Sequence, residues 1–337
     1  MTINKRRILL GSLGLIVTIL AVLAILGMVF ERVSAIRITS QYPPPGKLYD
    51  VGGWRMHLNC VGRGPVTVVF ESGLGDTSRA WSKIHLQVAE FSRACTYDRT
   101  GLGWSEVPRT LPPRDADHVV AELHTVLRKA GEQGPFVLVG HSLGGLEVQL
   151  YAFRFPAETA GLVLVDSVHP QQRVRLHREQ QSAEYSKTLE WYKLGAPFGL
   201  TRLLHECLDE DAPVADCAQF YRVLFDEFTR LPESFSEANV LDKHPLGKKP
   251  LLVLSRDPNS AASLQDPAAP IWEQMQAELA DELSENSVRW IVIGAGHGIN
   301  SDKPEVVLEA IHRVIAAAEN GVPLNGAPPA GAIVPAH

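Results

Sequence analysis

The motif GHSLG at residues 140–144 constrains the fold of this chain more than any other feature. It follows the apolar run 136–139, which is typical of a buried strand, and it precedes residues 146–155, whose pattern predicts a helix ended by Pro156. Glycines on both sides of a serine permit a sharp strand-to-helix turn, because they carry no Cβ that would clash with a strained backbone. Such a turn exposes the Ser142 hydroxyl to a histidine on one side and to backbone N–H donors on the other. The motif therefore predicts nucleophilic acyl transfer.

Strand-like and helix-like segments alternate through most of the remaining chain. Residues 116–130 have apolar positions at helical spacing, and other helical stretches separate the apolar runs. The runs that predict strands are 47–51, 54–60, 67–70, 94–97, 136–139, 161–165, 251–254 and 288–293. This alternation predicts an α/β fold with a mostly parallel eight-stranded sheet and flanking helices, in which loops at the carboxyl ends of the strands form the site.

One region interrupts the alternation. From about 171 to 244 the chain is polar and helix-like, with scattered aromatic side chains such as Trp191 and Phe225. This insertion after the sixth strand is expected to form a helical cap above Ser142. Most of its aromatic side chains are expected to form a small core of the cap, and some of them to line an acyl pocket.

Composition favours one globular domain over residues 47–318. Of the 337 residues, 45% are hydrophobic and 21% are charged, which is ordinary for a packed protein. The formal net charge of -6 offers no basic surface for nucleic acid, so small or apolar substrates are the better expectation. The final segment, 319–337, is rich in proline, glycine and alanine and is predicted to be a disordered tail.

The amino terminus has the composition of a membrane segment. Basic residues within 1–7 precede an uncharged stretch over 8–30. At about 1.5 Å per residue this stretch makes a helix of about 34 Å, enough to cross a hydrocarbon core of about 30 Å. The basic cluster is expected to keep 1–7 in the cytoplasm and to place the domain on the extracytoplasmic side, beyond a Pro-rich linker over 31–46.

A cleaved signal peptide is the alternative for this segment, because the sequence VSA at 33–35 resembles a cleavage site. The apolar core of a signal peptide spans only about 7 to 15 residues, and the stretch here is much longer. The length therefore favours an uncleaved signal anchor.

The four cysteines suit an extracytoplasmic domain. Cys207 and Cys217 lie ten positions apart in a polar segment, and Cys60 and Cys95 each lie in a strand-like run. An even number in an exported chain favours two disulfides, 60 to 95 and 207 to 217, although four cysteines permit three pairings and could instead stay buried thiols. No C-x-x-C or paired-histidine spacing accompanies them, so no metal site is predicted.

Four ordered motifs together resemble the α/β-hydrolase superfamily over residues 47–318. They are ESGLG at 71–75, YDRTGLGWS at 97–105, GHSLG at 140–144 and GAGH at 294–297. Each follows a predicted strand, as it does in that superfamily. The resemblance implies an α/β-hydrolase fold whose functional residues occur in the order serine, acid, histidine.

His297 is the candidate general base, because it follows an apolar run and lies between two glycines in a loop that can carry the imidazole to Ser142. The acid is less well defined. In the common family pattern an aspartate occupies the position at which this chain has Asn259, while Asp257 lies two residues earlier. Asp166, at the end of the sixth strand, occupies a place that some lipases of the superfamily use. We expect a carboxylate from Asp166, with Asp257 as the alternative, because an amide cannot stabilise an imidazolium equally well.

The oxyanion hole is expected to use backbone donors. The N–H of Leu143, at the start of the helix after Ser142, is one donor, and the resemblance makes the N–H of Leu74 the second. Many members of the family carry His-Gly where this chain has Ser72-Gly73, a change that leaves backbone donation possible.

These residues favour a membrane-anchored serine hydrolase, of the carboxylesterase or lipase type, that cleaves an ester or related acyl bond through an acyl-enzyme intermediate. Haloalkane dehalogenases and epoxide hydrolases resemble the chain in fold but carry aspartate at the place of Ser142. No cofactor is predicted, since the ESGLG segment has neither a phosphate-loop lysine nor a G-x-G-x-x-G pattern. The alternative is a non-catalytic binding or signalling module, for which the missing acid at 259 is the hint. The acyl group, the leaving group and the oligomeric state stay open.

Overall fold

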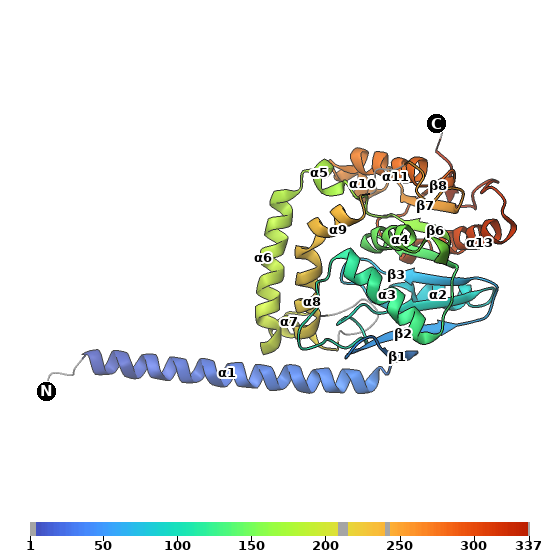
Figure 1. Ribbon diagram of the computed structural model, residues 1–337. Coiled ribbons are helices and arrows are strands. Elements are labelled where there is room, and N and C mark those ends of the chain that lie inside the picture. Colours follow the sequence, from blue (N-terminus) through green and yellow to red (C-terminus); the bar gives the residue numbers. More distant parts are fainter. Residues whose placement is uncertain (1–4, 208–214, 240–242, 336–337) are drawn as a thin grey trace. The chain divides into compact units, whose positions relative to one another are not determined.

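The structure, a computed structural model, describes residues 5–207, 215–239 and 243–335 (Figure 1). It divides into two compact units, each described here by itself. We call residues 44–183 and 226–337 the sheet unit, and residues 1–43 and 184–225 the helical unit. The boundaries between the units fall within two helices of the insertion.

The sheet unit is built on one sheet with the strand order β1-β2-β4-β3-β5-β6-β7-β8-β9. The strands from β4 to β8 in this order are parallel, whereas β1, β2 and β9 run antiparallel to their neighbours. The expected α/β architecture with a mostly parallel sheet is confirmed, with a ninth strand in addition to the eight expected. The bounds are β1 Lys47–Asp50, β2 Arg55–Val61, β3 Thr67–Glu71, β4 Arg93–Tyr97, β5 Phe136–His141, β6 Thr159–Val165, β7 Pro250–Arg256, β8 Asn286–Val292 and β9 Ala332–Ile333.

Two apolar layers cover the sheet, because successive strand residues point to opposite faces. Val69, Leu138 and Leu164 pack in one layer, and their neighbours Phe70 and Val139 pack in the other. The first layer is completed by α3 (Ala116–Ala130), α4 (Leu143–Arg154) and α11 (Ala269–Leu283). The second is completed by α2 (Ser82–Val88) and α13 (Pro304–Asn320). Short helical turns occur at η1 (Ser78–Trp81), η2 (Pro156–Glu158), α10 (Ala261–Gln265) and α12 (Ile299–Asp302).

The segment 319–337 is not a disordered tail in the part that the structure describes, so that prediction is wrong there. Residues of β9 pair with Ile291 and Val292 of β8, and the Ala332 side chain is buried. Leu324 N–H also donates to the Asn286 Oδ1 at 2.7 Å. A Pro- and Gly-rich segment cannot build a core of its own, but it can add to the open edge of an existing sheet. Residues 336 and 337 lie outside the described part.

The insertion between β6 and β7 is helical, as its composition predicts. Its elements are α5 (Gln172–Leu176), α6 (Glu179–Gly195), η3 (Ala196–Phe198), α7 (Leu200–Leu203), α8 (Cys217–Thr229) and α9 (Leu231–Glu237). Residues 208–214 and 240–242 of the predicted cap lie outside the described part of the chain.

The helical unit contains α1 (Lys5–Gln41), a single helix of 37 residues drawn in blue in Figure 1. Over Leu9–Gln41 it is long and apolar enough to cross a membrane, and the most apolar part of it is exposed. The linker predicted for 31–46 is wrong for 31–41, which are helical. The helix ends just before Pro43, because the residue that precedes a proline is disfavoured in helical conformation. Residues 1–4 of the predicted cytoplasmic segment lie outside the described part.

Both predicted disulfides are present. Cys60 and Cys95 lie directly opposite each other on the antiparallel strands β2 and β4. The second disulfide joins Cys207 to Cys217 within the helical unit. The described part of the chain contains no free cysteine.

Candidate active site

Ser142 lies on the sharp turn between β5 and α4, with φ 53° and ψ -120°. A non-glycine residue rarely adopts this conformation, and it persists only where the surrounding structure holds it. Two flanking glycines make the turn possible. A Cβ on Gly140 would lie 2.4 Å from the Gly144 carbonyl oxygen, and a Cβ on Gly144 would lie 2.5 Å from the Ser72 carbonyl oxygen. The glycine spacing in the motif therefore reflects close backbone contacts around the serine.

Ser142, His297 and Asp166 form a continuous chain of hydrogen bonds. The His297 Nδ1 lies 2.6 Å from the Asp166 Oδ2, and the His297 Nε2 lies 2.9 Å from the Ser142 Oγ. A carboxylate can only accept, so in the neutral form of this imidazole the proton is on Nδ1 and Nε2 is left to accept from the serine hydroxyl. This is the tautomer that a general base needs. His297 lies on the loop between β8 and α12 and is partly exposed.

Asp166 follows β6 directly and its carboxylate is fully buried. Its Oδ1 accepts from the Trp272 Nε1 at 2.9 Å and from the Arg256 backbone N–H at 3.2 Å. The Arg256 side chain also pairs with its Oδ2, at 2.9 Å. Burial by itself would raise the pKa of Asp166, but the hydrogen bond from His297 and the charge of Arg256 outweigh burial and hold the pKa below its usual value. Asp166 is therefore an anion at neutral pH.

Asp257, the alternative acid, is engaged elsewhere. Its Oδ2 accepts from the Gly294 N–H at 2.8 Å, and its Oδ1 accepts from the Asn259 N–H at 2.8 Å. The bond from Gly294 ties the loop after β7 to the start of the loop that carries His297. Of the two aspartates, the structure brings Asp166 to the imidazole.

The two expected oxyanion donors lie on segments that meet at Ser142. Leu143 is the first residue of α4, and the first N–H groups of a helix have no partner within the helix. The loop that carries Leu74 passes beside the serine: a Cβ on Gly73 would lie 3.4 Å from the Ser142 Cβ. A carbonyl bound at the Ser142 hydroxyl would therefore have backbone on two sides.

Arg99 and Glu227 hold the loop that carries Leu74 in place. Arg99 donates to the carbonyl oxygens of Ser72, at 2.7 Å, and of Gly73. Glu227 accepts from the Gly75 N–H at 3.1 Å and from the Arg99 Nε at 2.9 Å. In a planar trans peptide the C=O and the next N–H point in opposite directions. Because Arg99 binds the Gly73 carbonyl, the N–H of Leu74 points away from Arg99.

Arg99 belongs to a buried cluster of charged groups in the sheet unit. It also lies 2.9 Å from a carboxylate oxygen of Glu71 and 3.4 Å from one of Glu147. Burial raises the pKa of both glutamates, and the positive charge of Arg99 acts in the opposite direction. The sequence contained Arg99 within the YDRTG segment, but nothing in the sequence linked it to Glu227, which lies 128 positions away.

His141 is a further residue whose place near the site was not predicted. Its Nε2 lies 2.9 Å from the His297 carbonyl oxygen, and since a carbonyl can only accept, this nitrogen carries the proton. Burial, with the neighbouring His297, lowers the pKa of His141 to about 4, so the ring is neutral at neutral pH. A neutral donor next to Ser142 thus fixes the backbone of the loop that bears His297.

One group of potential metal ligands occurs among the described residues. Cys60, Cys95 and Glu132 have ligand atoms within 4.8 Å of one another. Both sulfur atoms belong to a disulfide, and Glu132 pairs with Arg93 at the start of β4. A sulfur in a disulfide is not a thiolate, so these three residues do not form a metal site in this state.

Residues 68–310 match the model of the alpha/beta hydrolase family. The match covers more than half of the chain. The chain belongs to the alpha/beta hydrolase family. Membership accounts for the order of Ser142, Asp166 and His297 along the chain, since this family places the serine before the acid and the histidine last.

Two bacterial proteins resemble this chain in sequence. The uncharacterized protein YqjL of Bacillus subtilis is 27% identical over 298 residues, which cover 82% of this chain and 95% of that protein. The uncharacterized protein YbdG of the same species is 32% identical over 131 residues, but this alignment covers only 40% of YbdG and 38% of this chain.

Two solved structures illustrate the likeness. A probable hydrolytic enzyme of Pseudomonas aeruginosa superposes with a TM-score of 0.61 at 17% identity, covering 81% of this chain and 95% of that one. The epoxide hydrolase of Bacillus megaterium superposes with a TM-score of 0.56 at 16% identity, covering 80% of this chain and 100% of that one. Identities this low show a common fold alone.

Proposed function

We propose that this protein is a membrane-anchored serine hydrolase that cleaves a carboxylic ester or a related acyl bond. The observation that carries the proposal is the unbroken chain of hydrogen bonds from Asp166 through His297 to Ser142. A serine hydroxyl is a weak nucleophile at neutral pH, and an adjacent imidazole held in the correct tautomer is the usual means of activating it.

The reaction would proceed in two stages. Ser142 Oγ attacks the substrate carbonyl while the His297 Nε2 takes its proton, and the N–H groups of Leu74 and Leu143 stabilise the oxyanion. His297 then gives the proton to the leaving group, and an acyl-enzyme remains on Ser142. Water, activated by His297, releases the acyl group and restores the serine. Asp166 orients the imidazole and stabilises its charged form throughout.

A non-catalytic binding module has little support from these contacts. Its basis was the missing acid at position 259, and His297 has a buried carboxylate partner in Asp166 instead. The epoxide hydrolase and dehalogenase chemistries of this superfamily use an aspartate as nucleophile, and Ser142 stands at that place in this chain.

The membrane anchor is the second half of the proposal. The apolar surface of α1 over Leu9–Phe30 is exposed, which is costly in water and favourable in lipid. The basic residues before it would keep the amino terminus in the cytoplasm and place the sheet unit on the extracytoplasmic side. Two disulfides agree with an oxidising compartment.

A fluorophosphonate probe tests the chemistry, because it labels only a serine that is activated as a nucleophile. We expect the full-length protein to be labelled and to hydrolyse an activated ester, and we expect Ser142→Ala to lose both. Ser182→Ala, at an exposed helical serine, is the matched control and should keep both. A wild-type protein that is correctly folded and yet remains unlabelled would contradict the proposal.

A further inference from the structure

An apolar surface lies in the helical unit, which contains none of the residues proposed to act in catalysis. Six large side chains within 191–204 are exposed, from the end of α6 through η3 and α7, and we call them the apolar cap face. Their exposed fractions are Trp191 74%, Leu194 56%, Phe198 38%, Leu200 51%, Leu203 61% and Leu204 66%. So many exposed apolar side chains close together in a short segment mark a surface that is covered in the working protein.

The apolar cap face adjoins α1. A Cβ on Gly27 would lie 2.2 Å from the Phe198 carbonyl oxygen, so the backbone of α1 touches that of η3. On the other side of this contact, a Cβ on Gly199 would lie 2.9 Å from the Phe30 ring. The exposed apolar surface of α1 is therefore continuous with that of η3 and α7.

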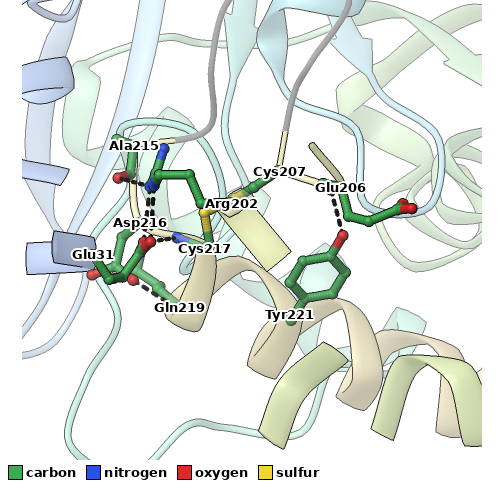
Figure 2. Close-up of a disulfide and its surroundings, with 9 residues drawn as sticks. All are labelled: Glu31, Arg202, Glu206, Cys207, Ala215, Asp216, Cys217, Gln219 and Tyr221. Carbon is green, nitrogen blue, oxygen red and sulfur yellow. Dashed lines mark hydrogen bonds and ion pairs between the residues drawn. A yellow bond between two sulfur atoms is a disulfide. The ribbon is translucent and has the colours of Figure 1, made fainter. Parts of the chain in front are cut away.

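A buried ion pair fixes this contact (Figure 2). Glu31 is only 5% exposed, and its carboxylate accepts from the Arg202 Nε and Nη2, each at 2.8 Å. The backbone N–H of Cys217 donates to the same carboxylate at 3.0 Å, and Arg202 also donates to the Ala215 carbonyl at 3.0 Å. The first charge after the apolar stretch of α1 is thus neutralised inside the helical unit.

The position of this contact along α1 indicates how deep η3 would lie in a bilayer that α1 crosses. Gly27 precedes Glu31 by four residues, or about 6 Å of helix. If α1 crosses the bilayer, η3 touches it just inside the level at which its charged residues begin. Amphipathic elements that lie in the membrane interface bury their apolar faces to a depth of about 5 to 10 Å. The distance of about 6 Å between Gly27 and Glu31 along the helix falls within this range.

We propose that the apolar cap face is a second membrane contact, inserted into the boundary between headgroups and acyl chains beside α1. The inference rests on the proposed anchoring by α1. The occupant is a lipid bilayer because this surface continues that of the spanning helix and lies at the same level. Trp191 at its margin agrees with the enrichment of tryptophan at membrane interfaces. The consequence is that the chain is held at two points, which fixes the orientation of the helical unit on the membrane.

Tryptophan fluorescence provides the test, since α1 contains no tryptophan and Trp191 is the one tryptophan of the helical unit. The full-length protein is reconstituted into vesicles of phosphatidylcholine and phosphatidylglycerol, with phosphatidylcholine brominated either near the carbonyl end or near the middle of its acyl chains. Bromine quenches only nearby indoles. We expect stronger quenching by the shallow label, and loss of most of this quenching in Trp191→Phe.

One further variant and two controls complete the design. Leu203→Glu, at a side chain whose exposure lets the fold tolerate the change, should reduce the quenching of Trp191. Leu264→Glu is the matched control, because Leu264 is 72% exposed and lies in the sheet unit. Trp104→Phe, in the sheet unit, should leave the quenching intact.

The outcomes separate this inference from the proposals on which it rests. Protein that alkaline carbonate strips from the vesicles would overturn both the anchor and the apolar cap face. Protein that stays in the membrane, but whose quenching is the same in Trp191→Phe, would overturn the apolar cap face alone. A Trp191 shielded from brominated lipid and from aqueous iodide would also overturn it, because a protein would then be the occupant. Labelling by fluorophosphonate reports on Ser142 independently.

Discussion

The sheet unit and the helical unit use apolar residues in opposite ways. In the sheet unit, Val, Leu and Phe side chains fill two closed layers on either side of the sheet. In the helical unit the same residue types face outward along α1 and over 191–204. The first arrangement is stable in water, while the second would be stabilised by the lipid contacts proposed above. Under these proposals, the residues for the reaction and those for membrane attachment belong to separate parts of the chain.

Each unit also contains an arginine paired with a buried glutamate, and the two pairs have different consequences. Arg99 and Glu227 hold a loop beside Ser142, whereas Arg202 and Glu31 join α1 to the segment that follows α6. Breaking a buried pair is expensive because one charge is left without a partner. Substitutions in the two pairs should therefore affect turnover in one unit and local stability in the other.

The largest effect is expected at Asp166. In Asp166→Asn the amide no longer favours the Nδ1–H tautomer of His297 and cannot stabilise its charged form, so kcat for an activated ester should fall about 10,000-fold. Asp257→Asn is the matched control and should retain nearly full turnover, since Asp257 contacts Gly294 and Asn259. A greater loss in Asp257→Asn than in Asp166→Asn would reverse the assignment of the acid.

The next largest effect is expected on the local stability of the helical unit. Glu31→Ala removes the buried carboxylate that accepts from both Arg202 and the Cys217 N–H, and breaking a buried ion pair typically costs about 3 to 5 kcal/mol. Hydrogen exchange of peptides across 196–205 should accelerate by at least about 100-fold, since 1.36 kcal/mol corresponds to a factor of ten.

Turnover of the ester by Glu31→Ala should remain at the wild-type level, because the residues proposed for catalysis all belong to the sheet unit. Glu132→Ala, which breaks the Arg93 pair of the sheet unit, is the control for hydrogen exchange. Unchanged exchange across 196–205 in Glu31→Ala would contradict the role given to the buried pair.

Stability of the sheet unit should fall on acidification. Burial is the main cause that lowers the pKa of His141 and of His169 to about 4, from an ordinary value of 6.5. Between these two pH values the unfolded chain binds protons that the folded chain excludes, so stability is lost as the pH falls from 6.5 to 4. The loss approaches about 3 kcal/mol for each histidine.

The melting temperature of the full-length protein in detergent, measured between neutral and mildly acidic pH, checks this expectation. His141→Asn keeps a donor for the His297 carbonyl but does not titrate, so its melting temperature should depend less on pH. The same pH dependence in wild type and variant would show that His141 is not one of the responsible groups.

The smallest effect is expected for Glu227→Ala. The substitution frees the Gly75 N–H and one side of Arg99, so the loop that carries Leu74 loses part of its support. Complete loss of an oxyanion donor costs about 100-fold to 1,000-fold in kcat, and a loosened donor should cost about 10-fold to 100-fold with little change in KM. Glu132→Ala again serves as the control. A rise in KM with unchanged kcat would show that the loop acts in substrate binding instead.

Local sequence patterns predicted the sheet well, because a buried parallel strand is a short apolar run whatever surrounds it. All eight expected strands are present near their predicted positions, and both disulfide pairs were identified from spacing and context. β9 was not predicted from the sequence, because a strand that pairs with the open edge of a sheet needs few hydrophobic residues. The N-terminal helix was predicted to end at residue 30, which is too early. The sequence alone does not show that Glu31 pairs with Arg202, 171 positions later.

The residues of the candidate site also differ in how well the sequence predicts them. Ser142 and His297 could be located from their motifs, since glycines around each residue signal the loop that it needs. Asp166 and Asp257 both follow strands, so only the three-dimensional path of the loops distinguishes them. The sequence did not predict the support given by Arg99, Glu227 and His141, because their contacts join segments that are distant in the chain.

The disulfide between Cys60 and Cys95 has a consequence for the loop that carries Leu74. The stretch of chain between the two cysteines includes β3 and residues 72–75, so the crosslink closes a covalent ring around this loop. Reduction would open that ring, and β2 and β4 would then be held together by hydrogen bonds and side-chain packing. An oxidising environment would therefore preserve a covalent constraint on the segment proposed to receive a developing negative charge.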